Sequence, residues 1–114
     1  MASLLRWQWE GYPRYHRSRA NLLLHIVLVP LFLIGNVVLV VALVQHIWLT
    51  AVAAAAVMLV SVALQGRGHR KEPVPPEPFA SAFNALARIF CEQWLTFPRF
   101  VATGGWSRAF HAAP

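Results

Sequence analysis

Two long apolar segments dominate the pattern of hydrophobic and polar positions along this chain. Between Arg19 and Arg67 there is no Lys, Arg, Asp or Glu. A stretch of that length cannot form the surface of a globular domain, which needs charged residues to stay soluble. It divides at Gln45-His46 into residues 21–44 and residues 47–64. The first part is long enough to cross ~30 Å of hydrocarbon at ~1.5 Å per residue, and the second part is shorter. The pattern therefore predicts a transmembrane hairpin of two helices.

The two predicted spans differ in composition. The first contains Pro30, which removes a helical hydrogen bond and is expected to kink the helix. The second is rich in Ala and Val, and residues 51–56 offer a smooth face for close helix packing.

Residues 1–20 have a different pattern, in which aromatic and basic residues alternate irregularly. Aromatic rings favour the headgroup zone of a bilayer, and arginine side chains extend toward the phosphates. Pro13 interrupts any continuous helix there. We therefore expect an interfacial arm that lies along the membrane.

A linker and a further helix are predicted after the second span. Residues 65–78 form a linker rich in His and Pro, and its proline run cannot be helical. Residues 79–97 then show apolar side chains at spacings of three and four, which predicts an amphipathic helix that lies on the membrane or caps the hairpin. Pro98 is expected to end this helix, which leaves residues 98–114 as a tail.

The polar side of that amphipathic helix contains Asn84, Arg88 and Glu92. Arg88 and Glu92 are four residues apart and are expected to form an ion pair on the face opposite the apolar side chains. A third full span is disfavoured, because it would carry both charges into the bilayer.

Charge indicates the orientation and the class of partner. The net charge is +6, and all ten Lys and Arg flank the apolar block. This distribution fits anionic lipid headgroups and the positive-inside rule better than a nucleic-acid partner. Because residues 1–20 and 65–71 are basic and the connecting turn is not, both termini are expected to be cytoplasmic, with His46 alone on the far side. The chain is thus predicted to be an all-α integral membrane protein with one membrane domain, residues 1–114.

The single cysteine, Cys91, excludes an internal disulfide and a Cys-rich zinc site. We interpret it as a small apolar residue of a helix.

Three histidines are predicted to meet at the cytoplasmic rim of the hairpin. His16 precedes the first span by about five residues, His25 lies inside it, and His69 follows the second span by about five. Together with Glu72, these imidazoles are candidate ligands for Fe(II), Mn(II) or Zn(II). A carboxylate with imidazoles and open positions would favour non-haem iron and oxygen chemistry. Asn21 shares a helix face with His25.

Other roles for these polar residues remain open at this point. His25 alone fits equally well as a hydrogen-bonding group that joins the two spans. Arg17, Arg19 and Arg70 are candidates to hold an acidic lipid head such as a fatty-acid carboxylate, but they also fit as ordinary positive-inside anchors.

A series of residues at fixed spacing resembles a known family. The series is Tyr15-His16-x4-Asn21-x3-His25-x4-Pro30. It resembles the N-terminal motif of the fungal 2-hydroxy-fatty-acid dioxygenase family and its bacterial relatives. The second half is similar to that family in having Gly68-His69, an acidic residue, prolines and a helix that contains Asn84.

The resemblance implies an Fe(II)-dependent integral membrane enzyme of fatty-acid α-oxidation. Such an enzyme shortens a long-chain 2-hydroxy fatty acid by one carbon, using O2. Its iron ligands here would be His16, His25 and His69, with Glu72 as a further candidate. Asn21 would orient a ligand or a bound water molecule.

Two alternatives are kept. The chain would instead be a non-enzymatic accessory subunit if its Ala-rich face and Trp-rich arms pack on partner proteins. Haem binding by His25 and a second histidine would need facing imidazoles deep in a bundle. In either case a hairpin this small is expected to bury its faces in a homo-oligomer or a larger membrane complex.

Overall fold

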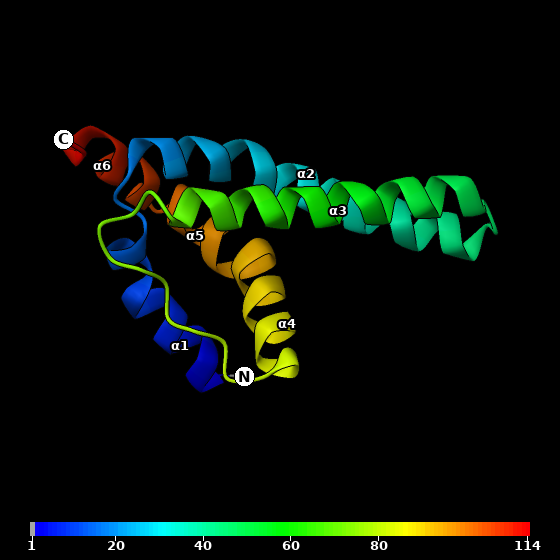
Figure 1. Cartoon of the computed structure of the whole chain (residues 1–114), viewed down its shortest axis with the longest axis horizontal. Coiled ribbons are helices and arrows are strands. Elements are labelled where there is room, and N and C mark those ends of the chain that lie inside the picture. Colours follow the sequence, from blue (N-terminus) through cyan, green and yellow to red (C-terminus); the bar gives the residue numbers. More distant parts are fainter. Residues whose placement is uncertain (1) are drawn as a thin grey trace.

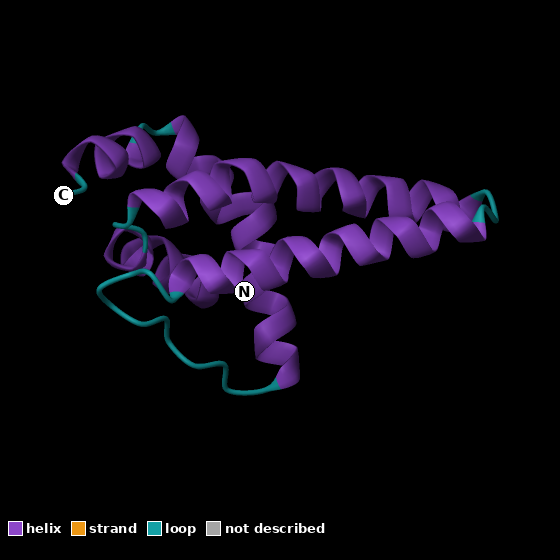
Figure 2. Ribbon diagram, turned by 45° about the horizontal axis from the view of Figure 1, so that its top comes forward, coloured by secondary structure: helices purple, strands orange, loops and turns teal. Residues whose placement is uncertain are grey.

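Helices joined by short connections, with one longer linker, make up the computed structural model, which describes residues 2–114 (Figures 1 and 2). The elements are α1 (Ala2–Gly11), the 3-10 helix η1 (Tyr12–Tyr15), α2 (Arg19–Val44), α3 (Trp48–His69), α4 (Ala82–Cys91), the π-helix η2 (Glu92–Thr96), α5 (Phe97–Ala102) and α6 (Gly105–Ala112). Within the described residues there is no strand, which confirms the prediction of an all-α fold.

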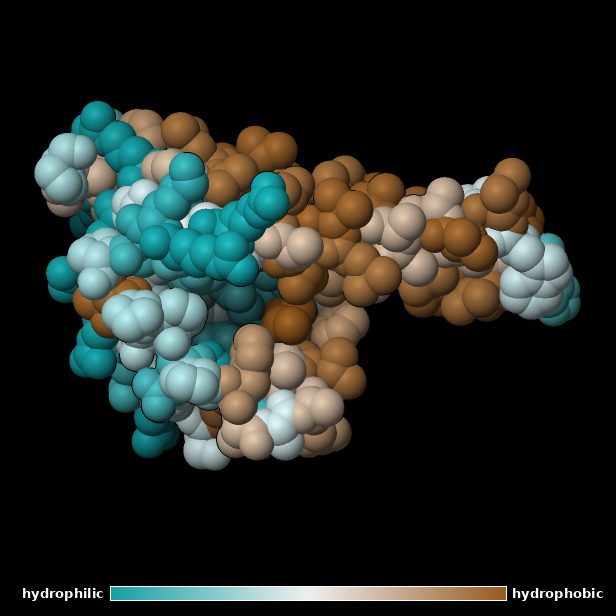
Figure 3. All heavy atoms as spheres, viewed as in Figure 1, coloured by the Kyte–Doolittle hydropathy of each residue, from teal (hydrophilic) through white to brown (hydrophobic). Residues whose placement is uncertain are grey.

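The antiparallel pair α2 and α3 forms the long axis of the molecule (Figure 1). With 26 and 22 residues, these helices are about 39 and 33 Å long at ~1.5 Å per residue. Both are long and apolar enough to cross a membrane, as predicted. Hydrophobic side chains cover most of this hairpin, whereas hydrophilic residues gather at its open end (Figure 3).

Small residues bring the two long helices together. Ala51 and Ala54 of α3 are buried, in agreement with the smooth face predicted there, and Ala42 of α2 is buried as well. A Cβ on Gly35 would lie 2.9 Å from Met58 Cγ. Close packing of this kind is typical of helix pairs that cannot use hydrophobic burial from water to associate.

The second long helix extends further than the sequence indicated. It continues to His69, five residues past the predicted end at residue 64, so the predicted linker of residues 65–78 begins too early. Gly66 and Gly68 weaken a helix by propensity. Here Gln65 and Gly68 are both buried, so packing stabilises this last part of α3.

The helix predicted for residues 79–97 begins three residues later, at Ala82 after its N-cap Ser81, and the helical region extends further than expected. Pro98 does not end the helix, because the chain widens into η2 just before it and then continues as α5. Proline has no N–H, and its ring would clash with the carbonyl four residues earlier in a regular α-helix. The wide turn, in which Phe97 N–H bonds to the Glu92 carbonyl, accommodates it. The predicted tail, residues 98–114, contains α5 and α6.

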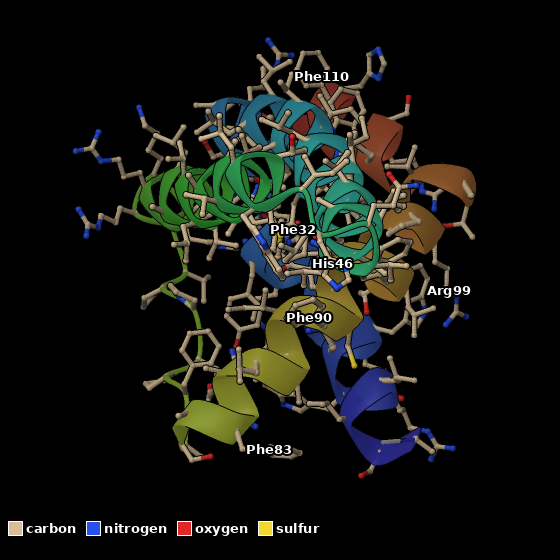
Figure 4. All side chains as sticks on the ribbon, turned by 90° about the vertical axis from the view of Figure 1, so that its right-hand side faces the viewer. Phe32, His46, Phe83, Phe90, Arg99 and Phe110 are labelled. Carbon is tan, nitrogen blue, oxygen red and sulfur yellow. The ribbon has the colours of Figure 1, made fainter. Side chains whose placement is uncertain are left out.

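The short helices pack around the open end of the hairpin. Their shared core consists of Tyr12, Leu22, Val29, Phe97 and Phe100. Trp106 of α6 donates a hydrogen bond from its indole nitrogen to the Leu22 carbonyl, at 2.9 Å. The turn that contains His46 lies at the opposite end, nearest the viewer in Figure 4.

Two glycines of α3 provide a matched test of this packing. We expect Gly68→Ala to destabilise the protein by about 1–3 kcal/mol, because the new Cβ would press on the Asn21 side chain and on Leu24. Gly66→Ala should instead be neutral or stabilising by up to ~1 kcal/mol, because no atom lies within 4 Å of its Cβ position. Denaturant unfolding in micelles checks both, and equal effects of the two changes would contradict the described approach of α2 to α3.

Candidate metal centre

Three imidazoles meet at the open end of the hairpin, as the sequence predicted. His16 follows η1, His25 lies in the second turn of α2, and His69 is the last residue of α3. The centroids of their rings are 4.9 to 5.0 Å apart in all three pairs, with the ring planes nearly perpendicular. Residues far apart in the sequence thus form one compact cluster.

Backbone contacts define which nitrogen of two imidazoles carries the proton. His16 Nδ1 lies 2.8 Å from the Tyr12 carbonyl oxygen, and His25 Nδ1 lies 3.0 Å from the Asn21 carbonyl oxygen. A carbonyl oxygen only accepts hydrogen bonds, so each Nδ1 is a donor. In the neutral imidazole the Nε2 atom is then an unprotonated ligand atom, the arrangement found in metal-binding histidines.

Three other ring nitrogens of the cluster are buried without hydrogen-bond partners. Within the described residues, His16 Nε2, His25 Nε2 and His69 Nδ1 accept or donate no hydrogen bond. A buried polar atom left unpaired costs about 1–3 kcal/mol. Three such atoms in one cluster call for a specific explanation, and a metal ion would satisfy all of them at once.

Glu92 completes the cluster. Its Oε2 atom lies 3.4 Å from His16 Nε2 and 3.7 Å from His25 Nε2. The ligand atoms of the four side chains all lie within 4.8 Å of one another. Ligands bound at ~2.1 Å to one ion are up to about 4 Å apart, so small side-chain movements would close this group around an ion.

This position of Glu92 corrects the sequence interpretation. Glu92 was expected to pair with Arg88 on a face turned away from the centre, and that expectation is wrong. The Arg88 guanidinium instead donates to the carbonyl oxygens of Glu77 and Pro78, at 2.8 and 3.0 Å. Glu92 lies at the first residue of η2, and its side chain is only 17% exposed.

The surroundings keep the Glu92 carboxyl ionised. Burial raises its pKa, but the close contact with His16 and the electrostatic interactions with the imidazoles of His25 and His69 outweigh burial and lower the pKa to about 2. Tyr12 also donates a hydrogen bond from its hydroxyl to Glu92 Oε2, at 2.7 Å. Burial and the nearby Glu92 charge raise the pKa of this phenol well above its usual value, so it stays protonated and remains a donor.

Glu72 has a different role from the one the sequence suggested. The structure brings Glu92 to the three imidazoles and places the Glu72 carboxylate against the start of α2. There it accepts hydrogen bonds from the backbone of Arg17 at 2.7 Å and of Ser18 at 3.0 Å. It also accepts one from Asn21 Nδ2, at 2.7 Å. A carboxylate at this position pairs the free N–H groups of the helix N-terminus and complements its dipole.

Asn21 connects this anchor to the metal-binding cluster. Its side chain donates to Glu72, and its carbonyl oxygen accepts from His25 Nδ1. The residue is fully buried. Asn21 therefore links the position of the His25 ring to that of the Glu72 carboxylate.

The three arginines predicted to bind substrate are separated. Arg17 lines a cavity of about 460 Å³ that also reaches His16 and is bounded by Arg108 on α6. Arg19 donates from Nε to the Phe110 carbonyl at 3.1 Å, which ties α6 to α2. Arg70 is exposed at the end of α3. Only Arg17 shares a cavity with a residue of the metal-binding cluster.

A buried ladder of polar side chains holds the wide turn of η2 in place. Gln65 and Gln93 exchange two hydrogen bonds through their amides, at 2.9 and 2.8 Å. Ser61 donates to the Leu28 carbonyl at 2.7 Å. Because Gln93 follows Glu92 directly, this ladder fixes the carboxylate relative to both long helices.

The donor set suits a borderline metal ion. It consists of three imidazoles and one carboxylate, which match Fe(II), Mn(II) and Zn(II) and not the soft ions that prefer thiolates. Buried Cys91 is not among the four residues. The group therefore fits a divalent transition metal, and its chemistry alone does not choose among the three ions.

The sequence did contain a signal for Glu92. Among residues 91–97, Glu92, Gln93 and Thr96 are polar in a helix otherwise rich in apolar side chains. An acidic residue in a membrane-associated helix is a functional candidate by default. However, Glu92 lies four residues after Arg88, and this spacing favours an ion pair between them over a role for Glu92 as a metal ligand.

Two glutamate variants distinguish the candidate metal ligand, Glu92, from the residue that anchors the start of α2, Glu72. We expect Glu92→Gln to lower metal affinity at least ~10-fold without lowering the stability of the metal-free protein, because it removes a buried charge from the cluster. Glu72→Gln should lower the unfolding temperature of the metal-free protein, because its amide N–H groups face three donors. Exposed Glu10→Gln is the control for both measurements. Metal retention by Glu92→Gln at the wild-type level would contradict the assignment of this ligand.

Removing the Tyr12 hydroxyl tests whether its hydrogen bond positions Glu92 for metal binding. Tyr12→Phe keeps the ring that stacks on His16, with centroids 3.7 Å apart, but removes the donor to Glu92. We expect a loss of metal affinity of about 10-fold with unchanged helical content. Tyr15→Phe is the matched control. A metal titration followed by spectroscopy compares them, and identical affinities would show that the Tyr12 hydroxyl does not position the carboxylate.

Comparisons with known proteins add no assignment. No family model, no curated protein and no solved structure matches this chain. The resemblance to the dioxygenase family therefore stays a prediction from the sequence, and the function has to be argued from the geometry of the metal centre.

Proposed function

We propose that the chain is an integral membrane, Fe(II)-dependent dioxygenase that shortens long-chain 2-hydroxy fatty acids by one carbon. The observation that supports this most strongly is the cluster of three buried, unpartnered imidazole nitrogens beside the Glu92 carboxylate. Buried atoms without hydrogen-bond partners are costly, so their retention favours a bound ion over a structural role.

Exposed apolar surface supports the membrane location. Only 28% and 22% of the residues in the most apolar parts of α2 and α3 are buried, whereas the core helices of a soluble protein would be mostly buried. Leu49 is 83% exposed and Leu59 is 73% exposed. With the basic residues at the open end, the positive-inside rule favours cytoplasmic termini and a metal centre near the cytoplasmic surface.

The side chains have distinct tasks in this proposal. His16, His25, His69 and Glu92 would hold the iron, which supplies Lewis acidity and the activation of O2. Tyr12 holds the carboxylate through a hydrogen bond, and the surrounding helices exclude bulk water. Four protein ligands leave positions open for a substrate.

A cationic group near the centre supports the choice of an acidic substrate. Arg17 lines the cavity that reaches His16 from the side of α5 and α6. A guanidinium pairs well with a carboxylate, so Arg17 is the arginine best placed to attract the acid group of a 2-hydroxy acid. Arg19 is already engaged with Phe110, and Arg70 is exposed to solvent.

Turnover tests the proposal directly. Aerobic incubation of the purified protein with Fe(II) and 2-hydroxypalmitate should yield the acid one carbon shorter, detected by mass spectrometry. His25→Ala and His69→Ala should each lose bound iron and product while still inserting into membranes. His46→Ala, at the far end of the hairpin, should keep both.

Two outcomes would contradict the enzyme and favour an accessory subunit. One is a folded protein with less than about one-tenth of an equivalent of iron, manganese or zinc after gentle purification. The other is equal loss of folding in all three histidine variants, which would show that the imidazoles serve the fold alone.

A further inference from the structure

A second cavity, of about 360 Å³, reaches the candidate metal centre and is not lined by Arg17. His16, His69 and Glu92 are among its lining residues. The walls come from α1, α3, α4 and the proline-rich linker, and their apolar side chains include Trp7, Val62, Phe79 and Ile89. This volume lies in the range of small-molecule binding pockets.

The polar side chains of the walls are already paired with one another. Gln65 and Gln93 bond to each other through both amides. Gln8 donates to the Arg88 carbonyl at 2.9 Å. These amides leave little to offer a polar ligand, and most of the cavity surface is apolar, with His16, His69 and Glu92 as the lining residues that belong to the cluster.

Arg88 lines the cavity and joins three segments of its wall. Its guanidinium lies over the rings of Trp7 and Phe79, 4.9 and 4.4 Å from their centroids. It also holds the linker through the carbonyls of Glu77 and Pro78. These contacts join α1, α4 and the linker into one wall.

One wall of the cavity continues into the outer surface of the hairpin. Leu59, Val62 and Gly66 follow one another at spacings of three and four and share a face of α3. Leu59 and Gly66 are exposed, whereas Val62 is partly buried at the cavity. An apolar ligand dissolved in the bilayer would therefore meet this face first.

We propose that this cavity binds the acyl chain of the substrate, with its polar head at His16, His69 and Glu92. The identity of that head rests on the proposed function, whereas the acyl site rests on the cavity itself. Val62 of α3 and Ile89 of α4 line the cavity, so we expect the size of these two side chains to set the chain length that fits. The acyl chain comes either from a free fatty acid or from a membrane lipid ester.

Photolabelling of the metal-free protein in nanodiscs tests the acyl site without relying on turnover. The two probes are 2-hydroxypalmitic acid and phosphatidylcholine, each with a diazirine near the end of the acyl chain. We expect the labels on the segments that contain Trp7, Val62, Phe79 and Ile89, mapped by mass spectrometry. Labelling by the free acid identifies a free fatty acid as the source, and labelling by the phospholipid identifies a lipid ester.

Filling the cavity should block labelling. Val62→Trp is expected to reduce it about tenfold, and Val60→Trp, on the outer face of the same helix and 56% exposed, should leave it unchanged. If Val62→Trp fails to fold, Ile89→Phe serves the same purpose. The milder Val62→Ala should shift the preference toward longer acyl chains.

Different results would contradict the acyl site and the dioxygenase activity. Labels spread over the outer faces of α2 and α3, or equal loss in Val62→Trp and Val60→Trp, would overturn the acyl site even if the protein binds iron and turns over substrate. Specific labelling of a protein that binds no metal would support the acyl site and contradict the dioxygenase.

Discussion

The contact on which the metal centre depends most is that between the Glu72 carboxylate and the first turn of α2. One carboxylate pairs two backbone N–H groups, of Arg17 and Ser18, and the side chain of Asn21. Hydrogen bonds to a charged group contribute about 1.5–3 kcal/mol each. Because Glu72 follows His69, and its three partners lie between His16 and His25, this anchor fixes the three imidazoles relative to one another.

The molecule has two faces with opposite chemistry at its open end. On α4, Phe83 is 81% exposed and turned away from the hairpin, whereas Phe90 contacts Phe32 of α2 (Figure 4). The polar side chains Glu92 and Gln93 of η2 find partners inside the protein. The proposed membrane location would explain this arrangement, because apolar groups exposed to lipid lose nothing and polar groups need internal partners.

The sequence predicted those parts of the fold that depend on local pattern. The apolar run gave both long helices, and their antiparallel order was enough to bring His16, His25 and His69 together. The expected position of Glu92 is wrong because the polar side of an amphipathic helix is ordinarily taken to face water, whereas here Glu92 faces the three imidazoles. Pro98 was expected to stop the helix, and only the tertiary packing shows that the wide turn of η2 absorbs it. Such contacts join residues far apart in the sequence, such as Tyr12 and Glu92, which are 80 positions apart, and local spacing does not reveal them.

X-ray absorption spectroscopy of the iron-loaded protein is the most direct test of the proposed ligand set, because it reports the atoms around the metal. We expect three imidazole nitrogens and a carboxylate oxygen at about 2.0–2.2 Å, with the imidazole contribution reduced in His25→Ala and unchanged in His46→Ala. A sulfur ligand from Cys91, or fewer than three imidazoles in the wild-type protein, would contradict it.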